Sequence, residues 1–170
     1  MPTIEIRPAT SADAARIVAI YNRYIIDTTI SFEEQPVQEA EMAGRIRDVV
    51  DAGLPWLVAL HEGELVGYAY ATTWRARPAY RFSVESTVYL ADGASGRGWG
   101  ALLYGRLIDR LRAAGVRTVI AGIAQPNARS VALHERLGFR KVAHFADVGY
   151  KFERWVDVGY WQLSLAQEAQ

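Results

Sequence analysis

The glycine-rich turn that contains Gly96, Gly98 and Gly100 is the clearest binding signal in the chain. Glycine lets a backbone approach a ligand closely, and the free amides at a helix start carry partial positive charge, so the turn suits a pyrophosphate. The dinucleotide glycine pattern fails because Ala101 stands three positions after Gly98, and the P-loop fails because Trp99 replaces the lysine. A tight turn without a ligand is the alternative interpretation.

Glu85 is the only carboxylate in a predicted strand from Ser83 to Leu90. Side chains two positions apart share one face of a strand, so Glu85 lies beside Thr87. A carboxylate in this place can remove a proton from an ammonium group or hold the group by charge. An exposed glutamate paired with Arg81 is the alternative.

Three polar residues near the end of the chain share one face of a predicted helix. Asn127, Ser130 and His134 are spaced three and four apart. Histidine can donate or accept a proton near neutral pH, although a packed histidine is equally common. Tyr104, on an earlier predicted helix, is a rival proton donor, and its place in an apolar ladder favours a core role.

A basic cluster, Arg75, Arg77 and Arg81, precedes the strand that carries Glu85. A planar guanidinium binds a carboxylate or phosphinate through two parallel hydrogen bonds, which lysine cannot do. The cluster therefore predicts an anion clamp, and a solvated loop is the alternative.

The chain of 170 residues predicts one domain, residues 1–170, at about 150 residues per domain. Its 19 basic and 19 acidic residues give no net charge, which argues against a nucleic-acid partner bound through a large overall positive charge. The absence of cysteine excludes disulfides, zinc–cysteine sites and a thiol nucleophile. No metal is expected. No secretory leader or membrane-spanning run is visible, so we expect a cytoplasmic protein without a membrane partner.

Hydrophobic periodicity predicts the element order β α α β β β α β α β β, which is a mixed α/β architecture. The segment 116–124 lacks polar alternation and is predicted to be buried on both faces. The chain from 139 to 165 is predicted to form two strands joined by a loop near 147–153. The other expected elements are strands at 3–6, 56–61, 65–73 and 83–90, and helices that follow Asp13 and cover about 37–51, 99–114 and 127–138.

Placed between a strand and a helix, the segment from Ser95 to Gly100 resembles the pyrophosphate loop of the GNAT N-acetyltransferase superfamily, Arg/Gln-x-x-Gly-x-Gly/Ala. Ser95 departs from the usual Arg or Gln, and both glycines match. Residues 127–139 resemble the later Asn-x-x-Ser/Ala and Leu-Tyr-x-x-x-Gly-Phe segment. Residues 80–89 and 151–158 resemble the phosphinothricin and methionine sulfoximine N-acetyltransferase branch.

The resemblance implies a GNAT fold, with a central mixed and mostly antiparallel sheet flanked by helices. It implies acetyl-CoA as co-substrate and no metal. With no cysteine to carry an acetyl group, direct transfer in a ternary complex is expected. The residues implied to bind the cofactor are Val88, Tyr89, Leu90, Gly96, Arg97, Gly98, Trp99, Gly100, Ala101, Asn127 and Ser130.

The branch implies acetylation of the α-amino group of a small amino-acid analogue by a homodimer. Glu85 is then the base, and His134 stands where many members carry the tyrosine that protonates the CoA thiolate. Lys151 is expected to reach across the dimer interface. Other functions to weigh are a GNAT enzyme for a peptide or another amine and a non-catalytic CoA-binding domain. The residues implied to bind substrate are Phe32, Arg75, Arg77, Glu85, Ser86, Thr87 and Lys151.

Overall fold

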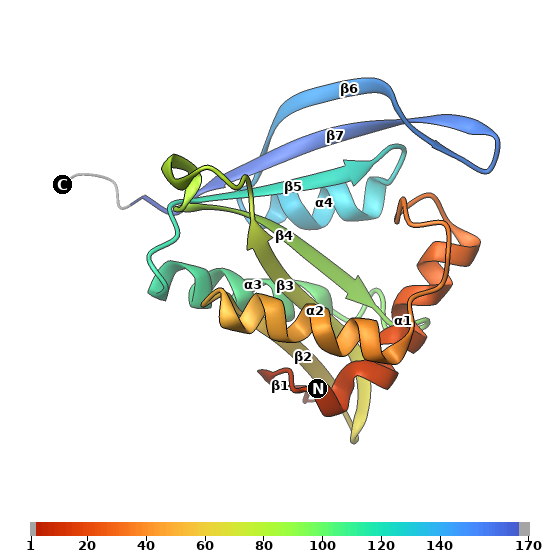
Figure 1. The fold of residues 1–170 in the computed structure, drawn as a ribbon, viewed down its shortest axis with the longest axis vertical. Helices are drawn as coiled ribbons and strands as arrows, with labels where there is room; N and C mark the ends of the chain where they lie inside the picture. Colours follow the sequence, from red (N-terminus) through yellow and green to blue (C-terminus); the bar gives the residue numbers. More distant parts are fainter. Residues whose placement is uncertain (1–2, 167–170) are drawn as a thin grey trace.

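A seven-stranded sheet forms the centre of the computed structural model, which describes residues 3–166 (Figure 1). The ends of the expected domain, residues 1–2 and 167–170, lie outside the described residues. The strands are ordered β1-β2-β3-β4-β5-β7-β6. The elements are β1 (Glu5–Pro8), α1 (Ala14–Asp27), α2 (Glu39–Asp51), β2 (Trp56–His61), β3 (Glu64–Thr73), β4 (Ser83–Leu90), α3 (Trp99–Ala113), β5 (Thr118–Ala124), α4 (Ala128–Arg136), β6 (Arg140–Lys151) and β7 (Arg154–Ser164), with short 3-10 turns at Ser11–Asp13 and Pro78–Tyr80.

The sheet is mixed and mostly antiparallel, as the resemblance implies. Its one parallel pair is β4 with β5, which α3 connects across one face. This pair is short, because Ser83–Glu85 pair with Thr118–Ile120 and the two strands then diverge (Figure 1). The remainder of β4 is paired along its other edge, with β3.

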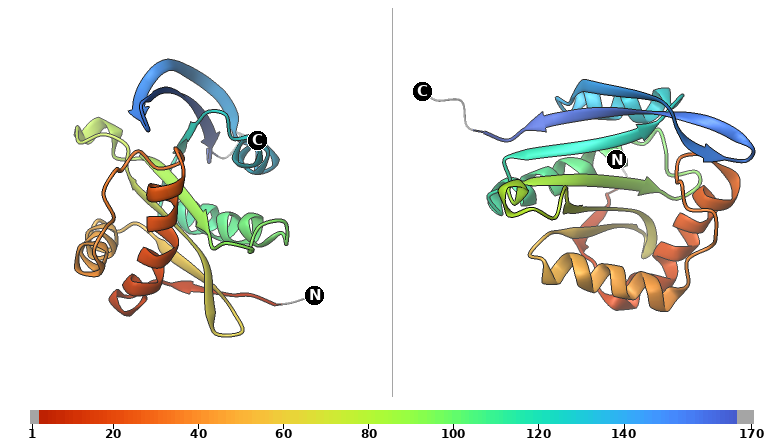
Figure 2. Two further views of the ribbon diagram at one scale, coloured as in Figure 1. Left: turned by 90° about the vertical axis from the view of Figure 1, so that its right-hand side faces the viewer. Right: turned by 45° about the horizontal axis from the view of Figure 1, so that its top comes forward.

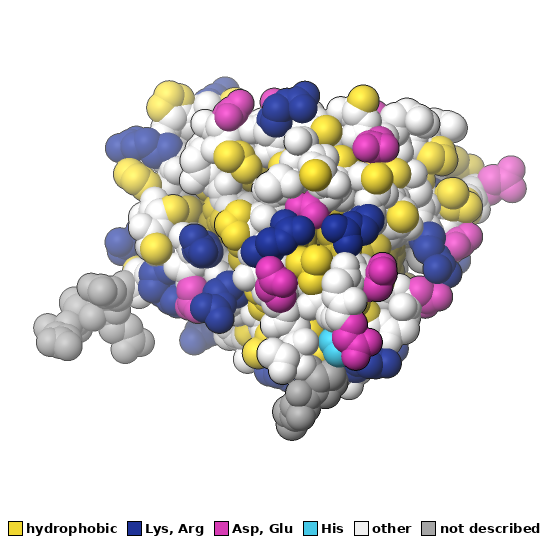
Figure 3. All heavy atoms as spheres, turned by 90° about the horizontal axis from the view of Figure 1, so that it is seen from below, with side chains coloured by type: hydrophobic (Ala, Val, Ile, Leu, Met, Phe, Trp, Pro, Cys, Tyr) yellow, Lys and Arg dark blue, Asp and Glu magenta, His cyan; other side chains and the backbone are white. Residues whose placement is uncertain are grey.

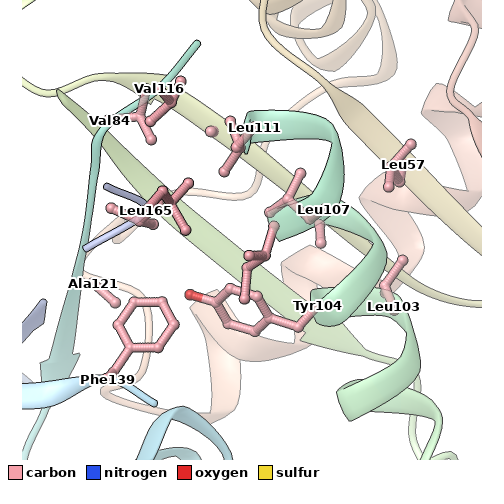
Figure 4. Close-up of a cluster of buried hydrophobic side chains, with 14 of the residues drawn as sticks. Leu57, Val84, Leu103, Tyr104, Leu107, Leu111, Val116, Ala121, Phe139 and Leu165 are labelled. Atoms are coloured by element: carbon pink, nitrogen blue, oxygen red, sulfur yellow. The ribbon is translucent and has the colours of Figure 1, made fainter. Parts of the chain in front are cut away.

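Helices cover both faces of the sheet, with α1 and α2 on one side and α3 and α4 on the other (Figure 2). The apolar ladder predicted for the third helix is confirmed, since Leu103, Leu107 and Leu111 are fully buried (Figure 4). A second cluster holds Ile17 of α1 and Ile46 of α2 against the opposite face. These two cores fix all four helices against the sheet.

A capping box at Thr10 and Asp13 holds the 3-10 turn that leads into α1. Asp13 is buried, and its carboxylate accepts hydrogen bonds from Arg7 at 2.8 and 2.9 Å and from the Thr10 amide at 2.8 Å. These hydrogen bonds to the charged form lower the pKa of Asp13. These hydrogen bonds connect β1, which carries Arg7, to the start of α1, the helix that carries Tyr21.

The expectation that residues 116–124 are buried on both faces is wrong. The strand begins at Thr118, and burial alternates along it, with Val119, Ala121 and Ile123 buried and Gly122 exposed. The second face is only partly buried, and at Gly122 and Ala124 it borders a cavity.

The expected loop at 147–153 is also wrong, because β6 continues to Lys151. The turn consists of Phe152 and Glu153 alone, both with positive φ (53° and 58°). A bulge at Asp147, with a φ of 51°, explains the loop-like sequence. The Asp147 amide donates to the Asp157 carboxylate at 2.9 Å, which replaces the lost ladder bond.

On the face seen in Figure 3, acidic and basic side chains are interspersed. No helix within residues 3–166 has the length and apolar character needed to cross a membrane. In the same part of the chain, no three side chains of the metal-binding types His, Cys, Asp and Glu gather to hold an ion.

Candidate active site

A cavity of about 510 Å³ opens where β4 and β5 diverge. Beyond Glu85, the edge of β4 that faces β5 has no strand partner, so its backbone groups can bind an extended ligand, except that the carbonyl oxygen of Leu90 already accepts from the Tyr24 hydroxyl at 2.6 Å. The residues that line the cavity are Tyr21, Ile30, Ser31, Phe32, Glu33, Glu85, Ser86, Thr87, Val88, Tyr89, Gly122, Ile123, Ala124, Asn127, Ser130, His134, Val158 and Tyr160. Nine of the residues expected at a site from the sequence therefore meet in one place: Phe32, Glu85, Ser86, Thr87, Val88, Tyr89, Asn127, Ser130 and His134.

Glu85 lies half-buried in the cavity wall on β4. Burial raises the pKa of its carboxyl, and the nearby positive charge of Arg75 partly opposes that shift. A raised pKa makes Glu85 a stronger proton acceptor than an ordinary glutamate, which suits a general base.

His134 is buried on α4, and both of its ring nitrogens have partners. Nδ1 lies 2.7 Å from the carbonyl oxygen of Ser130, and Nε2 lies 3.0 Å from the hydroxyl of Tyr104. Because a carbonyl only accepts, Nδ1 carries the hydrogen, and Nε2 of the neutral ring accepts from Tyr104. Burial lowers the pKa of His134, which favours this neutral form.

Tyr104 continues this chain toward the sheet. Its side chain is fully buried beside Phe139, with the ring centroids 5.6 Å apart (Figure 4). Because the Tyr104 hydroxyl donates its hydrogen bond to Nε2 of His134, the Tyr104 oxygen accepts from the hydroxyl of Ser86. Ser86 and His134 line the cavity and Tyr104 does not, so Tyr104 contacts a ligand only through them.

The loop between α1 and α2 forms a further part of the cavity wall, through residues 30–33. Glu33 accepts hydrogen bonds from Arg45 at 2.6 and 3.0 Å and from Tyr21, and these hydrogen bonds lower its pKa. Lys151 is buried, and its Nζ donates to the carbonyl oxygen of Ser31 at 2.6 Å. Three separate elements therefore hold the segment that carries Phe32.

The structure does not bring Arg75, Arg77 or Lys151 to the cavity wall. Both arginines are exposed on the loop before β4, and the Arg75 guanidinium lies 4.7 Å from the centre of the Trp74 ring. Lys151 instead donates a hydrogen bond to the carbonyl oxygen of Ser31 in its own chain.

The glycine turn lies next to this cavity and outside its lining. Gly96 and Gly98 have φ values of 80° and 79°, and a Cβ added at either would meet no atom within 4 Å. Their left-handed backbone, and not the space around them, therefore requires glycine. The amides of Trp99, Gly100 and Ala101 begin α3 and are free for an anion.

Two further side chains of the expected cofactor set have local packing partners. The ring of Trp99 is buried against His61, and Arg97 lies over that ring. Leu90 packs against Gly100, where an added Cβ would approach it to 3.3 Å. The contribution that Trp99 can make to an anion is therefore its backbone amide.

Sequence reasoning missed several lining residues, among them Tyr21, Glu33 and Val158. Tyr21 falls in the apolar period of α1 and carries no separate signal. Gly122 does carry one, because a glycine inside a strand pattern indicates close approach of another group.

Comparison with known proteins identifies the family. Residues 6–159 match the acetyltransferase (GNAT) domain family. The chain belongs to this family. It is 43% identical over 159 residues to a phosphinothricin N-acetyltransferase from Streptomyces viridochromogenes, with 94% of this chain and 86% of that protein covered. It is 40% identical to an L-methionine sulfoximine/L-methionine sulfone acetyltransferase from Pseudomonas aeruginosa, with 94% of each chain covered.

A solved structure gives the same result for the fold and the cofactor. The GNAT superfamily phosphinothricin acetyltransferase from Sinorhizobium meliloti, in complex with acetyl-CoA, superimposes with a TM-score of 0.92 at 40% identity. The match covers 95% of this chain and 88% of that one. The expected fold is confirmed, and so is the expected class, an N-acetyltransferase whose co-substrate is acetyl-CoA.

The contact between β6 and the loop gives a prediction for Gly149→Ala. A Cβ at Gly149 would lie 2.4 Å from the ring of Phe32, so the ring must leave its position in the cavity wall. We expect the KM for the acceptor amine to rise and the KM for acetyl-CoA to stay unchanged, with little loss of stability because the half-exposed Phe32 ring can move aside. Steady-state kinetics and thermal melts measure these changes.

Gly105→Ala is the matched control, because a Cβ there meets nothing within 4 Å on α3. An amine KM that is the same in Gly149→Ala and Gly105→Ala would contradict the role given to Phe32.

Proposed function

We propose that this acetyltransferase transfers an acetyl group from acetyl-CoA to the α-amino group of a small amino-acid analogue, of the phosphinothricin, methionine sulfoximine or methionine sulfone type. One observation carries the proposal. The cavity between the diverging strands unites a carboxylate of raised pKa, Glu85, with the chain Ser86–Tyr104–His134. The names and identities of the relatives support the choice of substrate.

In this proposal acetyl-CoA extends along the unpaired edge of β4. Its pantetheine arm binds backbone groups of Val88 to Leu90, and its pyrophosphate binds the amides of residues 96–101. Asn127 contributes from α4, where its Oδ1 accepts from the Ser130 amide at 3.2 Å. The side-chain NH₂ of Asn127 is then left to donate toward the arm.

Glu85 removes a proton from the substrate ammonium, because only the neutral amine is a nucleophile. The amine then attacks the thioester carbon directly, since the chain has no cysteine to form an acetyl-enzyme. His134 provides the proton that the departing thiolate needs.

We place the acceptor amine next to Phe32, on the loop after α1, and Thr87, on β4, because both side chains line the cavity. Neither arginine lines the cavity, but the charge of Arg75 acts on Glu85, so we assign the substrate carboxylate to Arg75 and its neighbour Arg77 on the loop before β4. Lys151 has a positioning role in this scheme, because its charged group is used to hold Ser31.

The homodimer is part of the same proposal. The β6–β7 hairpin exposes large apolar side chains that a partner copy would cover. Between 50% and 65% of each side chain is exposed in Val142, Phe145, Val148, Tyr150, Phe152 and Trp155.

A panel of amines tests the substrate class. Release of free thiol from acetyl-CoA is followed with phosphinothricin, methionine sulfoximine, methionine sulfone, common amino acids, polyamines and a peptide. We expect turnover with the analogues, and a rise of about tenfold or more in the amine KM for Arg77→Ala, because a charge-assisted pair is lost. A response confined to the peptide, or none with any amine, would contradict the proposal.

Glu85→Gln tests the base. We expect kcat to fall by about 10²- to 10⁴-fold while the Kd of CoA, measured by calorimetry, stays nearly constant. Because the pKa of Glu85 is raised, wild-type activity falls with decreasing pH as this carboxylate protonates, and the variant lacks that acidic limb. Glu62→Gln, at an exposed turn, is the control. Near-wild-type turnover in Glu85→Gln would remove Glu85 from the mechanism.

Light scattering tests the dimer. We expect twice the chain mass of 18.9 kDa for the wild type and the single-chain mass for Trp155→Glu, which places a charge in the apolar patch. Val50→Glu changes an equally apolar exposed side chain on α2 and should leave the mass of the dimer unchanged. A wild type with the mass of a single chain would contradict the proposed dimer.

A further inference from the structure

The partners of His134 restrict how it can deliver a proton. Nδ1–H is held by the Ser130 carbonyl at 2.7 Å, and Nε2 is held by the Tyr104 hydroxyl at 3.0 Å. Neither nitrogen presents a free N–H to the cavity. Nδ1 also lies 3.4 Å from the hydroxyl of Ser130, a longer contact than the one it makes with the Ser130 carbonyl. The path of shorter hydrogen bonds from His134 to the cavity runs from Nε2 through Tyr104.

Ser86 is the end of this chain that faces the cavity. It is the first residue of β4 beyond Glu85, which forms the last pair with β5. Its side chain is 6% exposed, lines the cavity and bonds to Tyr104. Its hydroxyl therefore lies at the apex where the strands part, with buried protein behind it and the cavity in front.

We propose that Ser86, Tyr104 and His134 form a proton relay that moves one proton from the attacking nitrogen to the departing thiolate. Ser86 is the catalytic residue that touches the reactants, Tyr104 is the connecting group, and His134 stores the proton. The inference rests on the function proposed above and assigns a different proton from the one that Glu85 takes.

The proton balance is complete without another reactant. After attack, the nitrogen of the tetrahedral intermediate is positively charged and gives a proton to Ser86 Oγ. The Ser86 proton moves to the Tyr104 oxygen, and the Tyr104 proton moves to Nε2 of His134.

The C–S bond then breaks, and the same path runs in reverse. Nε2–H returns a proton to Tyr104, Tyr104 to Ser86, and Ser86 to the thiolate sulfur. The amine has lost one proton, the thiol has gained it, and His134 is neutral again. The buried position of the ring keeps His134 neutral at rest and ready to accept.

The decisive comparison is Ser86→Thr against Ser86→Val, because these side chains have the same shape and differ in the hydroxyl group. We expect Ser86→Thr to keep kcat within about tenfold of the wild type, and Ser86→Val and Tyr104→Phe to lose about 10²-fold. The KM for acetyl-CoA should not change in any variant. The substrate is methionine sulfone. Wild-type kcat in Ser86→Val and Tyr104→Phe would overturn the relay, because His134 would then act directly.

The double variant Ser86→Val/Tyr104→Phe separates a relay from two independent losses. Removing either link should break the whole path, so we expect the double variant to be no slower than the slower single variant. Losses that multiply would overturn the proposal. Tyr68→Phe, in the other core cluster, controls for removal of a buried phenol. Thermal melts check that each variant is folded. If Ser86→Val does not fold, the kcat of Tyr104→Phe tests the relay.

These outcomes are distinct from a failure of the proposed function. A wild type that acetylates none of the amino-acid analogues contradicts that function. If the wild type acetylates the analogues and the Ser86→Val and Tyr104→Phe variants do so at the same rate, only the relay is contradicted.

Discussion

The divergence of β4 from β5 is the constraint on which the rest of this structure depends. Backbone N–H and C=O groups inside a protein need partners, and the two strands pair for three residues only before they separate. The unpaired part of β4 can therefore receive an extended ligand in place of a strand. The cavity, the glycine turn at the end of β4 and the helix α4 are all arranged around this opening.

Polar groups buried at the apex of the opening need partners of their own. The chain from Ser86 through Tyr104 to His134 joins β4, α3 and α4, and it leaves each of the three side chains hydrogen-bonded. The rings of Tyr104, His134 and Phe139 pack edge to face, which holds the histidine in one orientation. The same contacts that satisfy burial thus prepare a path for protons.

The acceptor wall depends on elements that are distant along the chain. Lys151 at the tip of the hairpin binds Ser31, which is 120 residues away, and Gly149 leaves the space that the ring of Phe32 fills. Arg45 of α2 holds Glu33 from a third direction. Buried charge is costly unless it is hydrogen-bonded, so the loop and the hairpin stabilise each other in a single arrangement.

The sequence by itself determined the features that neighbours within a few residues control. The glycine turn needs positive φ, the α3 ladder needs a period near 3.6, and Glu85 stands alone as a carboxylate in its strand, so each was predictable from local pattern. The motif resemblance added the family. Only the tertiary structure decided that Ser86 hydrogen-bonds to Tyr104, that Lys151 is buried against Ser31, and that one face of β5 is only partly buried. Those contacts depend on where whole elements pack and where two strands separate, which no local pattern encodes.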